Sequence, residues 1–232
     1  MSKMKYMIHS CNKRLWYVKK FLIPSMVSQG IDEKDIILWN DSESWGNLSS
    51  WLKSCEYIRD NEDITGGIWH LQDDVLICHD FKNITEEFKN ISSEIIHCGF
   101  VAETWGQKGK KYIGIQPAEH MWLSFQCIYI PNLYIVEFLS WFKYKTEVLK
   151  ELQDRVATGK QDDFIFYRFV RFEHPNDVVI NIKPNLVEHI DYLIGGSVAS
   201  EERDRKINKS AYFKEQILVD NLEMVLNNEK RI

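Results

Sequence analysis

Short apolar runs alternate with stretches of helical periodicity along the first half of the chain. Residues 5–10 (KYMIHS) fit a buried strand, and residues 14–29 place apolar side chains at helical spacing until Gly30 ends the pattern. Pro24 lies inside that pattern and is expected to kink or divide the helix. Further strands are predicted at residues 35–39, 68–71, 95–101, 112–115, 125–129 and 178–182. Further helices are predicted at residues 48–57, 84–91, 133–152, 164–172 and 212–226.

Alternation of strands and helices predicts parallel βαβ units with right-handed crossovers. The chain shows no internal repeat, low-complexity tract or obvious linker. We therefore expect one α/β domain over residues 1–200 and a helical extension over residues 201–232. The extension is amphipathic, so it either caps the domain or mediates self-association into a homo-oligomer.

The composition is that of a globular protein, with 44% hydrophobic and 27% charged residues. A net charge of −5 provides no global positive field for nucleic acid, although residues 108–111 (KGKK) are locally basic. Five cysteines, without CxxC spacing, predict reduced thiols and a cytoplasmic location rather than disulfides or structural zinc. No signal peptide is visible, and the least charged stretch, residues 121–136, is too polar for a membrane span. The protein is expected to be soluble.

Three polar sets fall at the ends of predicted strands, and ligands of open α/β sheets bind at the carboxyl ends of the strands. They are His9-Ser10, Asn40-Asp41 and Gln72-Asp73-Asp74. The first two are also ordinary turn residues, but the acidic pair is unusual because Leu71 and Val75 flank it. Adjacent carboxylates in an apolar setting repel each other, and a hard cation such as Mg²⁺ or Mn²⁺ would relieve the repulsion. The alternatives are a helix N-cap or a salt bridge to a nearby lysine.

A second acidic pair, Asp162-Asp163, opens the predicted helix at residues 164–172. Carboxylates at a helix N-terminus are favourable without any catalytic role, because they interact with the helix dipole. Further along, residues 184–190 read PNLVEHI and contain His189. A single histidine is more often a surface or core residue than a metal ligand.

The order of these motifs resembles the GT-A-type nucleotide-sugar glycosyltransferases. The resemblance rests on an early strand followed by Arg14, the DxD-like Gln72-Asp73-Asp74, the later Gln161-Asp162-Asp163, and the segment 184–190, which is similar to a PSLVxHxG motif. It covers most of residues 5–200. It implies a single three-layer, Rossmann-like GT-A domain with a mostly parallel mixed central sheet.

The resemblance also implies residue roles. Asp74 and His189 would hold Mn²⁺ or Mg²⁺, and Asp73 would face the ribose or sugar. Gln72 stands where the family usually has an acid, so its contact to ribose would be a neutral hydrogen bond. Asp163, with Asp162 beside it, matches the catalytic base of inverting members. The remaining nucleotide-sugar residues would be His9, Ser10, Arg14, Asn40 and Asp41, and Trp105 and Trp122 would line the acceptor side.

The expected activity is metal-dependent transfer of a sugar from a nucleotide-diphosphate sugar to a hydroxyl acceptor. UDP-sugars are the commonest donors in the resembled family. The acceptor could be a glycan, a lipid or a small molecule. One alternative keeps the fold and glycosylates a modified base in DNA, with residues 108–111 touching phosphates. Another is a non-catalytic relative that binds a glycan or a protein. A nucleotidyltransferase is disfavoured because residues near position 10 lack a glycine-rich phosphate loop.

Overall fold

The computed structural model describes residues 4–91, 94–100, 114–118, 123–148, 162–195 and 213–229. The first strands and helices follow the expected alternation. They are β1 (Lys5–Cys11), α1 (Leu15–Tyr17), α2 (Ile23–Ser28), β2 (Ile36–Asp41), α3 (Asn47–Asp60) and β3 (Gly67–Gln72). A π-helical turn, η1 (Val18–Leu22), joins α1 to α2, and a 3-10 turn, η2 (Glu33–Asp35), precedes β2.

The remaining elements carry the chain through the second half of the fold. The strands are β4 (Val75–Ile77), β5 (Ile96–Cys98), β6 (Gly114–Pro117), β7 (Cys127–Pro131), β8 (Val178–Asn181) and β9 (Val187–His189). The helices are α4 (Phe81–Ile91), α6 (Asn132–Val148), α8 (Asp162–Glu173), α9 (Asp191–Ile194) and α10 (Gln216–Glu229).

In the described part of the chain, seven strands form one mixed sheet in the order β2-β1-β3-β7-β5-β8-β6. Strand β1 pairs in parallel with β2 and β3, and β5 pairs in parallel with β8. Strand β7 runs antiparallel to both β3 and β5, and β6 runs antiparallel to β8. Most strands therefore share one direction. The chain passes from β1 to β2 on one side and then to β3 on the other, so the order reverses between β1 and β3.

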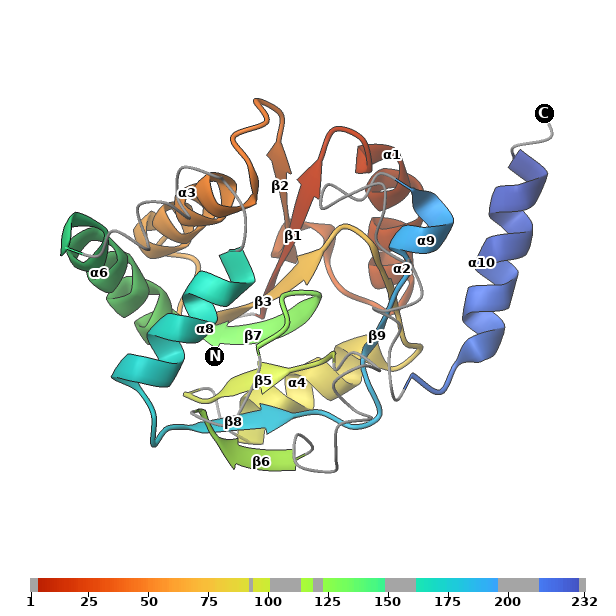
Figure 1. Ribbon diagram of the computed structural model, residues 1–232. Helices are drawn as coiled ribbons and strands as arrows, with labels where there is room; N and C mark the ends of the chain where they lie inside the picture. The colour runs from red at the N-terminus through yellow and green to blue at the C-terminus, as the bar shows by residue number, and fades with distance from the viewer. Residues whose placement is uncertain are drawn as a thin grey trace.

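Helices cover both faces of the sheet (Figure 1). Neighbouring residues of β1 and β3 alternate between the two faces, as the pleat of a strand requires. Met7 and Ile68 join a core with α3, α6 and α8, whereas Ile8 and Trp69 join a second core with α1, α2, β4 and β9. These two cores establish the predicted α/β architecture with a mostly parallel mixed sheet, which is compatible with a Rossmann-like fold.

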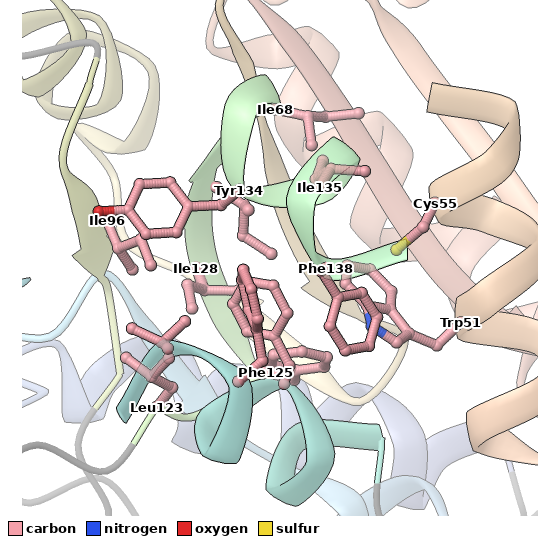
Figure 2. Packing of buried hydrophobic residues seen from close by; sticks show 14 of the residues in the cluster. Trp51, Cys55, Ile68, Ile96, Leu123, Phe125, Ile128, Tyr134, Ile135 and Phe138 are labelled. Atoms are coloured by element: carbon pink, nitrogen blue, oxygen red, sulfur yellow. The ribbon is translucent and has the colours of Figure 1, made fainter. Parts of the chain in front are cut away.

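Large aromatic side chains fill the core beneath α3, α6 and α8. Figure 2 shows Trp51, Phe125 and Phe138 pointing toward one another between helices and sheet. The Trp51 ring lies 4.8 Å from the Phe125 ring centroid and 5.0 Å from that of His70. Two of the eight tryptophans, Trp51 and Trp69, are completely buried in the two cores.

Two local features of the N-terminal helical segment follow from its sequence. The chain winds as a π-helix over η1 just before Pro24, which stands in the first turn of α2. A proline nitrogen has no hydrogen to donate, and the helix is not divided there: the backbone stays helical from residue 15 to residue 28, with π-helical hydrogen bonding over η1 before Pro24. Gly30 follows with a φ of 85°, a conformation that favours glycine, and ends the helix as expected.

The stretch at residues 69–77 (WHLQDDVLI) is not one interrupted strand. Strand β3 ends at Gln72, the acidic pair forms a turn, and β4 leaves the main sheet to pair antiparallel with β9. Strand β4 is only three residues long, and periodicity did not predict it as a separate strand. The turn takes the two carboxylates out of the central sheet. Inside that sheet, the backbone hydrogen bonds between strands could not compensate the charges of two buried side chains.

The C-terminal helix α10 packs against the domain through α9 and stands at its edge in Figure 1. Val219 and Leu222 are buried, whereas Ile217 and Met224 are 67% and 57% exposed. Before the helix, the Glu215 carboxylate accepts hydrogen bonds from the backbone N–H of His79 at 3.0 Å and lies 2.9 Å from its Nδ1. The helix thus covers part of the domain, and self-association through it stays a prediction.

No helix among the described residues is long and apolar enough to cross a bilayer.

We predict that Trp51→Ala lowers the free energy of unfolding by about 3–5 kcal/mol, the usual cost of removing a large buried aromatic side chain. Trp51 is completely buried among aromatic rings, whereas Trp16 is 42% exposed. Trp16→Ala is therefore the matched control, with an expected loss of about 1 kcal/mol or less. Denaturant unfolding of both variants measures the difference. Equal losses would contradict the described packing of α3.

Candidate functional site

The acidic pair lies where the carboxyl ends of β1 and β3 meet, at the reversal of strand order. Asp73 is held by three donors. Its Oδ2 accepts hydrogen bonds from Ser10 Oγ at 3.1 Å and from the Cys11 backbone N–H at 3.0 Å, and its Oδ1 accepts one from Arg14 Nη1 at 2.8 Å. Asp73 therefore ties the end of β1 and the start of α1 to the turn after β3.

Asp74 is less completely satisfied than its neighbour. Its Oδ2 accepts a hydrogen bond from Arg14 Nη1 at 2.5 Å and lies 3.2 Å from His189 Nε2. Its Oδ1 is buried without a hydrogen-bond partner in the described part of the chain. A buried carboxylate oxygen without a partner is costly, so Asp74 is the member of the pair with capacity for a ligand.

Pairing of β4 with β9 brings His189 to the acidic turn. Val75 is opposite His189 in this small sheet, and the Asp74 carbonyl accepts a hydrogen bond from the Ile190 N–H at 2.8 Å. The Nδ1 of His189 lies 3.7 Å from Asp191 Oδ1. Backbone pairing therefore positions an imidazole and a third carboxylate beside the pair.

Arg14 is the cation that compensates the two carboxylates. Its guanidinium contacts both of them and also donates from Nε to the Gly195 carbonyl at 3.3 Å. The salt bridge considered from sequence is therefore present, with arginine rather than lysine as the partner. The φ of Gly195 is 74°, so this carbonyl is presented by a conformation that favours glycine.

The pKa values of the cluster reflect its burial and its charges. Burial raises the pKa of Asp73, and the Asp74 charge raises it further, despite Arg14. Burial alone would also raise the pKa of Asp74, but the charges of His189 and Arg14 outweigh burial and hold that pKa below its usual range. Burial would lower the pKa of His189, and the Asp74 carboxylate outweighs it and raises that pKa.

The donor atoms fit a divalent cation in part. Asp74 Oδ2 and His189 Nε2 are close enough to bind one ion at ligand distances of about 2.0–2.2 Å. With Asp73 and Asp191 nearby, three carboxylates face one guanidinium and one imidazole. Against this, the described residues contain no group of three or more His, Cys, Asp or Glu side chains arranged around a common point. An ion here would have two protein ligands and would take the rest from water and phosphate, as Mg²⁺ commonly does.

His9 does not join the acidic cluster. Its Nε2 lies 2.8 Å from Ser50 Oγ on α3, and its ring packs against His70, on the face opposite Ser10. Desolvation lowers the pKa of His9 to about 4 and that of His70 to about 3. Gln72 is the parallel neighbour of His9 at the end of β3 and is half-buried.

Asn40 and Asp41 shape the loop after β2. Asn40 Nδ2 donates to Asn12 Oδ1 at 2.8 Å. The Asp41 carboxylate accepts hydrogen bonds from the backbone N–H groups of Trp45 at 2.9 Å and Gly46 at 3.2 Å, just before α3 begins. These contacts are the turn chemistry that the sequence also allowed for this pair.

Asp163 lies in the first turn of α8. Its Oδ1 is 2.7 Å from the Phe164 backbone nitrogen, and burial raises its pKa. Helix α8 belongs to the layer of α3 and α6, whereas Arg14 and His189 come from the opposite side of the sheet. Within the described residues, no hydrogen bond or ion pair joins Asp163 to the Asp74 cluster. Trp105, Trp122 and the basic segment 108–111 lie outside the described part of the chain, and only the backbone of Asp162 is described.

Sequence reasoning missed three contributions to the site. It assigned Arg14 to the nucleotide and did not connect it with the acidic pair, and it did not single out Cys11 or Asp191. Arg14 could have been found by asking which cation starts the helix next to the strand that pairs with β3. The other two depend on tertiary geometry, because one acts through its backbone N–H and the other through the β4–β9 pairing.

Neither a scan against models of known protein families nor a search of curated proteins finds a match to this chain. The fold and site define an α/β protein with a mostly parallel mixed sheet and a buried Arg–Asp–Asp–His cluster at the point where its strand order reverses.

We predict that His70 makes stability depend on pH below neutrality. Its pKa is about 3 in the folded protein against 6.5 for the ordinary group, so the unfolded chain binds more protons between these values. The contribution of neutral His70 to the free energy of unfolding is fully present above about pH 6.5. It is lost as pH falls, by up to about 1.4 kcal/mol per pH unit for one group. In urea unfolding from pH 7 to 5, His70→Gln should flatten this slope. His79→Gln, at an exposed histidine, is the control, and an unchanged slope in His70→Gln would refute the assignment.

Proposed function

We propose that the protein is a GT-A-type glycosyltransferase that moves a sugar from a nucleotide-diphosphate sugar to a hydroxyl acceptor. The observation that carries this proposal is the convergence of Asp74 and His189, 3.2 Å apart, with a buried carboxylate oxygen left unpartnered. These are the two residues that the family resemblance assigns to the metal, and they come from distant parts of the chain. The sequence order alone did not require them to meet.

The position of the cluster supports a nucleotide ligand. In open α/β sheets, ligands bind outside the carboxyl ends of the strands, where the strand order reverses. Here the reversal falls between β1 and β3, and Ser10, Cys11 and Asp73 are joined at that point. Ser10 and Asp73 were both expected beside the donor. In the described structure they are committed to each other, so we propose that they shape the wall of the donor site.

A divalent cation bound by Asp74 and His189 would supply neutralisation of the charge that develops on the departing diphosphate. The chain's own residues do the rest. Asp74 and His189 would hold that cation, and Arg14 adds a guanidinium that suits phosphate oxygens. Asp163 accepts the proton of the acceptor hydroxyl as that oxygen attacks the anomeric carbon. Burial raises the pKa of Asp163, which makes its carboxylate a stronger base.

We further propose that the donor is a UDP-sugar and that the protein acts in the cytoplasm. The donor follows the commonest choice in the resembled family. The location agrees with five cysteines that are all unpaired, although four of them are buried. The alternative DNA acceptor depends on residues 108–111, and no observation in the described part of the chain favours it.

One observation favours a second candidate, a non-catalytic module that binds a glycan or a protein. Arg14 already contacts both carboxylates, so the acidic pair is compensated without a metal. On this view the cluster only holds β1, β3 and α9 together. The two candidates differ in whether a nucleotide and a cation bind.

We predict that one nucleoside diphosphate stabilises the wild-type protein only with Mn²⁺. At about a hundred times its dissociation constant the ligand adds about 2.7 kcal/mol, a shift of several degrees in Tm. Asp74→Asn should lose this shift, because it removes the carboxylate charge. Asp63→Asn, at an exposed position, is the control and should keep it. The measurement is thermal unfolding in the presence of UDP, GDP, CDP or ADP. If none of them shifts Tm, the glycosyltransferase proposal is wrong and the non-catalytic module is favoured.

We predict that Asp163→Asn removes transfer but not donor binding. Loss of a general base lowers kcat by about 10²–10⁴-fold, whereas the Mn²⁺-dependent thermal shift should stay. Nucleotide release from the donor in the presence of an acceptor panel measures the rate, again with Asp63→Asn as control. Wild-type turnover in Asp163→Asn would show that another group takes the proton.

A further inference from the structure

One arginine nitrogen serves both carboxylates of the acidic turn. Arg14 Nη1 lies 2.8 Å from Asp73 Oδ1 and 2.5 Å from Asp74 Oδ2. The side chain is buried, and Nε reaches the Gly195 carbonyl at 3.3 Å. Arg14 thus contacts the same oxygen, Asp74 Oδ2, that a divalent cation shared with His189 would use.

The two carboxylates depend on Arg14 to different degrees. If the guanidinium left, Asp73 would keep hydrogen bonds from Ser10 Oγ and the Cys11 N–H. Asp74 would keep only the contact with His189 Nε2, since its Oδ1 has no hydrogen-bond partner among the described residues. A buried carboxylate that loses its cation is strongly destabilising unless another cation replaces it. Departure of Arg14 and arrival of a cation at Asp74 are therefore linked.

The backbone around Arg14 allows its side chain to change partners. Arg14 lies in a turn directly after β1, where its N–H donates to the Cys11 carbonyl at 3.0 Å, and α1 begins at the next residue. A rotation of the side chain therefore does not require β1 to move. The planar guanidinium matches the paired oxygens of a diphosphate, which would replace the two carboxylates as its partner.

We propose that Arg14 is an exchangeable counter-cation, a positioning residue that compensates Asp73 and Asp74 until a divalent cation replaces it on Asp74 and the donor diphosphate receives its guanidinium. This proposal rests on the proposed function. It makes the cation and the donor cooperative, because each provides what the other displaces. By linkage, each ligand must raise the affinity for the other by the same factor.

The test compares wild type with Arg14→Met, which removes the charge and keeps an unbranched apolar stem. Lys19→Met, at an exposed cation nearby, is the control. Binding of Mn²⁺ alone is measured from the signal of free Mn²⁺ in electron paramagnetic resonance, and binding of UDP with saturating Mn²⁺ by calorimetry. We expect Arg14→Met to bind Mn²⁺ more tightly and UDP more weakly, each by about ten- to a hundredfold, the range for one charge-assisted hydrogen bond. Lys19→Met should match wild type in both.

Opposite changes in the two affinities support exchange. If Mn²⁺ binding by Arg14→Met is unchanged or weaker, Arg14 does not compete with the cation and the proposal is wrong. Should Arg14→Met fail to fold, Arg14→Lys keeps the charge but presents fewer donors, and the same two opposite changes are expected with smaller size. Failure of the exchange is distinct from failure of the proposed function, in which wild type itself would bind no nucleotide with Mn²⁺.

Discussion

Compensation of two adjacent carboxylates by Arg14 is the interaction on which this site depends. The sequence places Asp73 and Asp74 directly after a buried strand, where like charges repel and desolvation is costly. The turn takes them out of the sheet, and one guanidinium then contacts both. Through the same contacts the end of β1, the start of α1 and the end of α9 are held at one point. Three segments that are distant in the sequence, namely the β1–α1 turn, the turn after β3 and the end of α9, thus meet where the two carboxylates are compensated.

The small sheet of β4 and β9 determines which other groups reach this point. Because β4 follows the acidic turn immediately, any strand that pairs with it delivers its own side chains to the turn. The register places His189 opposite Val75, and the Ile190 N–H bonds the Asp74 carbonyl. The backbone position of residue 189 is therefore fixed by hydrogen bonds that do not involve the imidazole. This geometry permits substitution at His189 with the surrounding backbone kept in place.

The pattern of apolar and polar residues along the sequence was enough to predict much of the fold and part of the site. The alternation of short apolar runs and helical periodicity predicted β1, β2, β3 and α3 within a few residues, because β1 and β3 are apolar runs buried on both faces and α3 buries one face. It missed β4, whose three residues are too few to show a period. It grouped His9 with Ser10, although successive residues of a strand point to opposite faces, and His9 contacts α3 instead. It also recognised that the acidic pair needed a partner. The identity of that partner depends on how the turn after β1 meets the turn after β3, which no local pattern contains.

The same cluster can be described as a completed salt bridge or as part of a cation site, and the two descriptions differ in the role that they give to the unpartnered Oδ1 of Asp74. A purely structural network is most stable when every buried donor and acceptor is paired, and Asp73 meets that condition with three donors. Asp74 does not, because Arg14 and His189 both address Oδ2 and leave Oδ1 unpartnered among the described residues. Selection for stability alone would favour an additional donor at that oxygen or an apolar residue in place of the acid. This asymmetry between an incompletely partnered Asp74 and a fully partnered Asp73 is the observation on which the proposed ligand site rests.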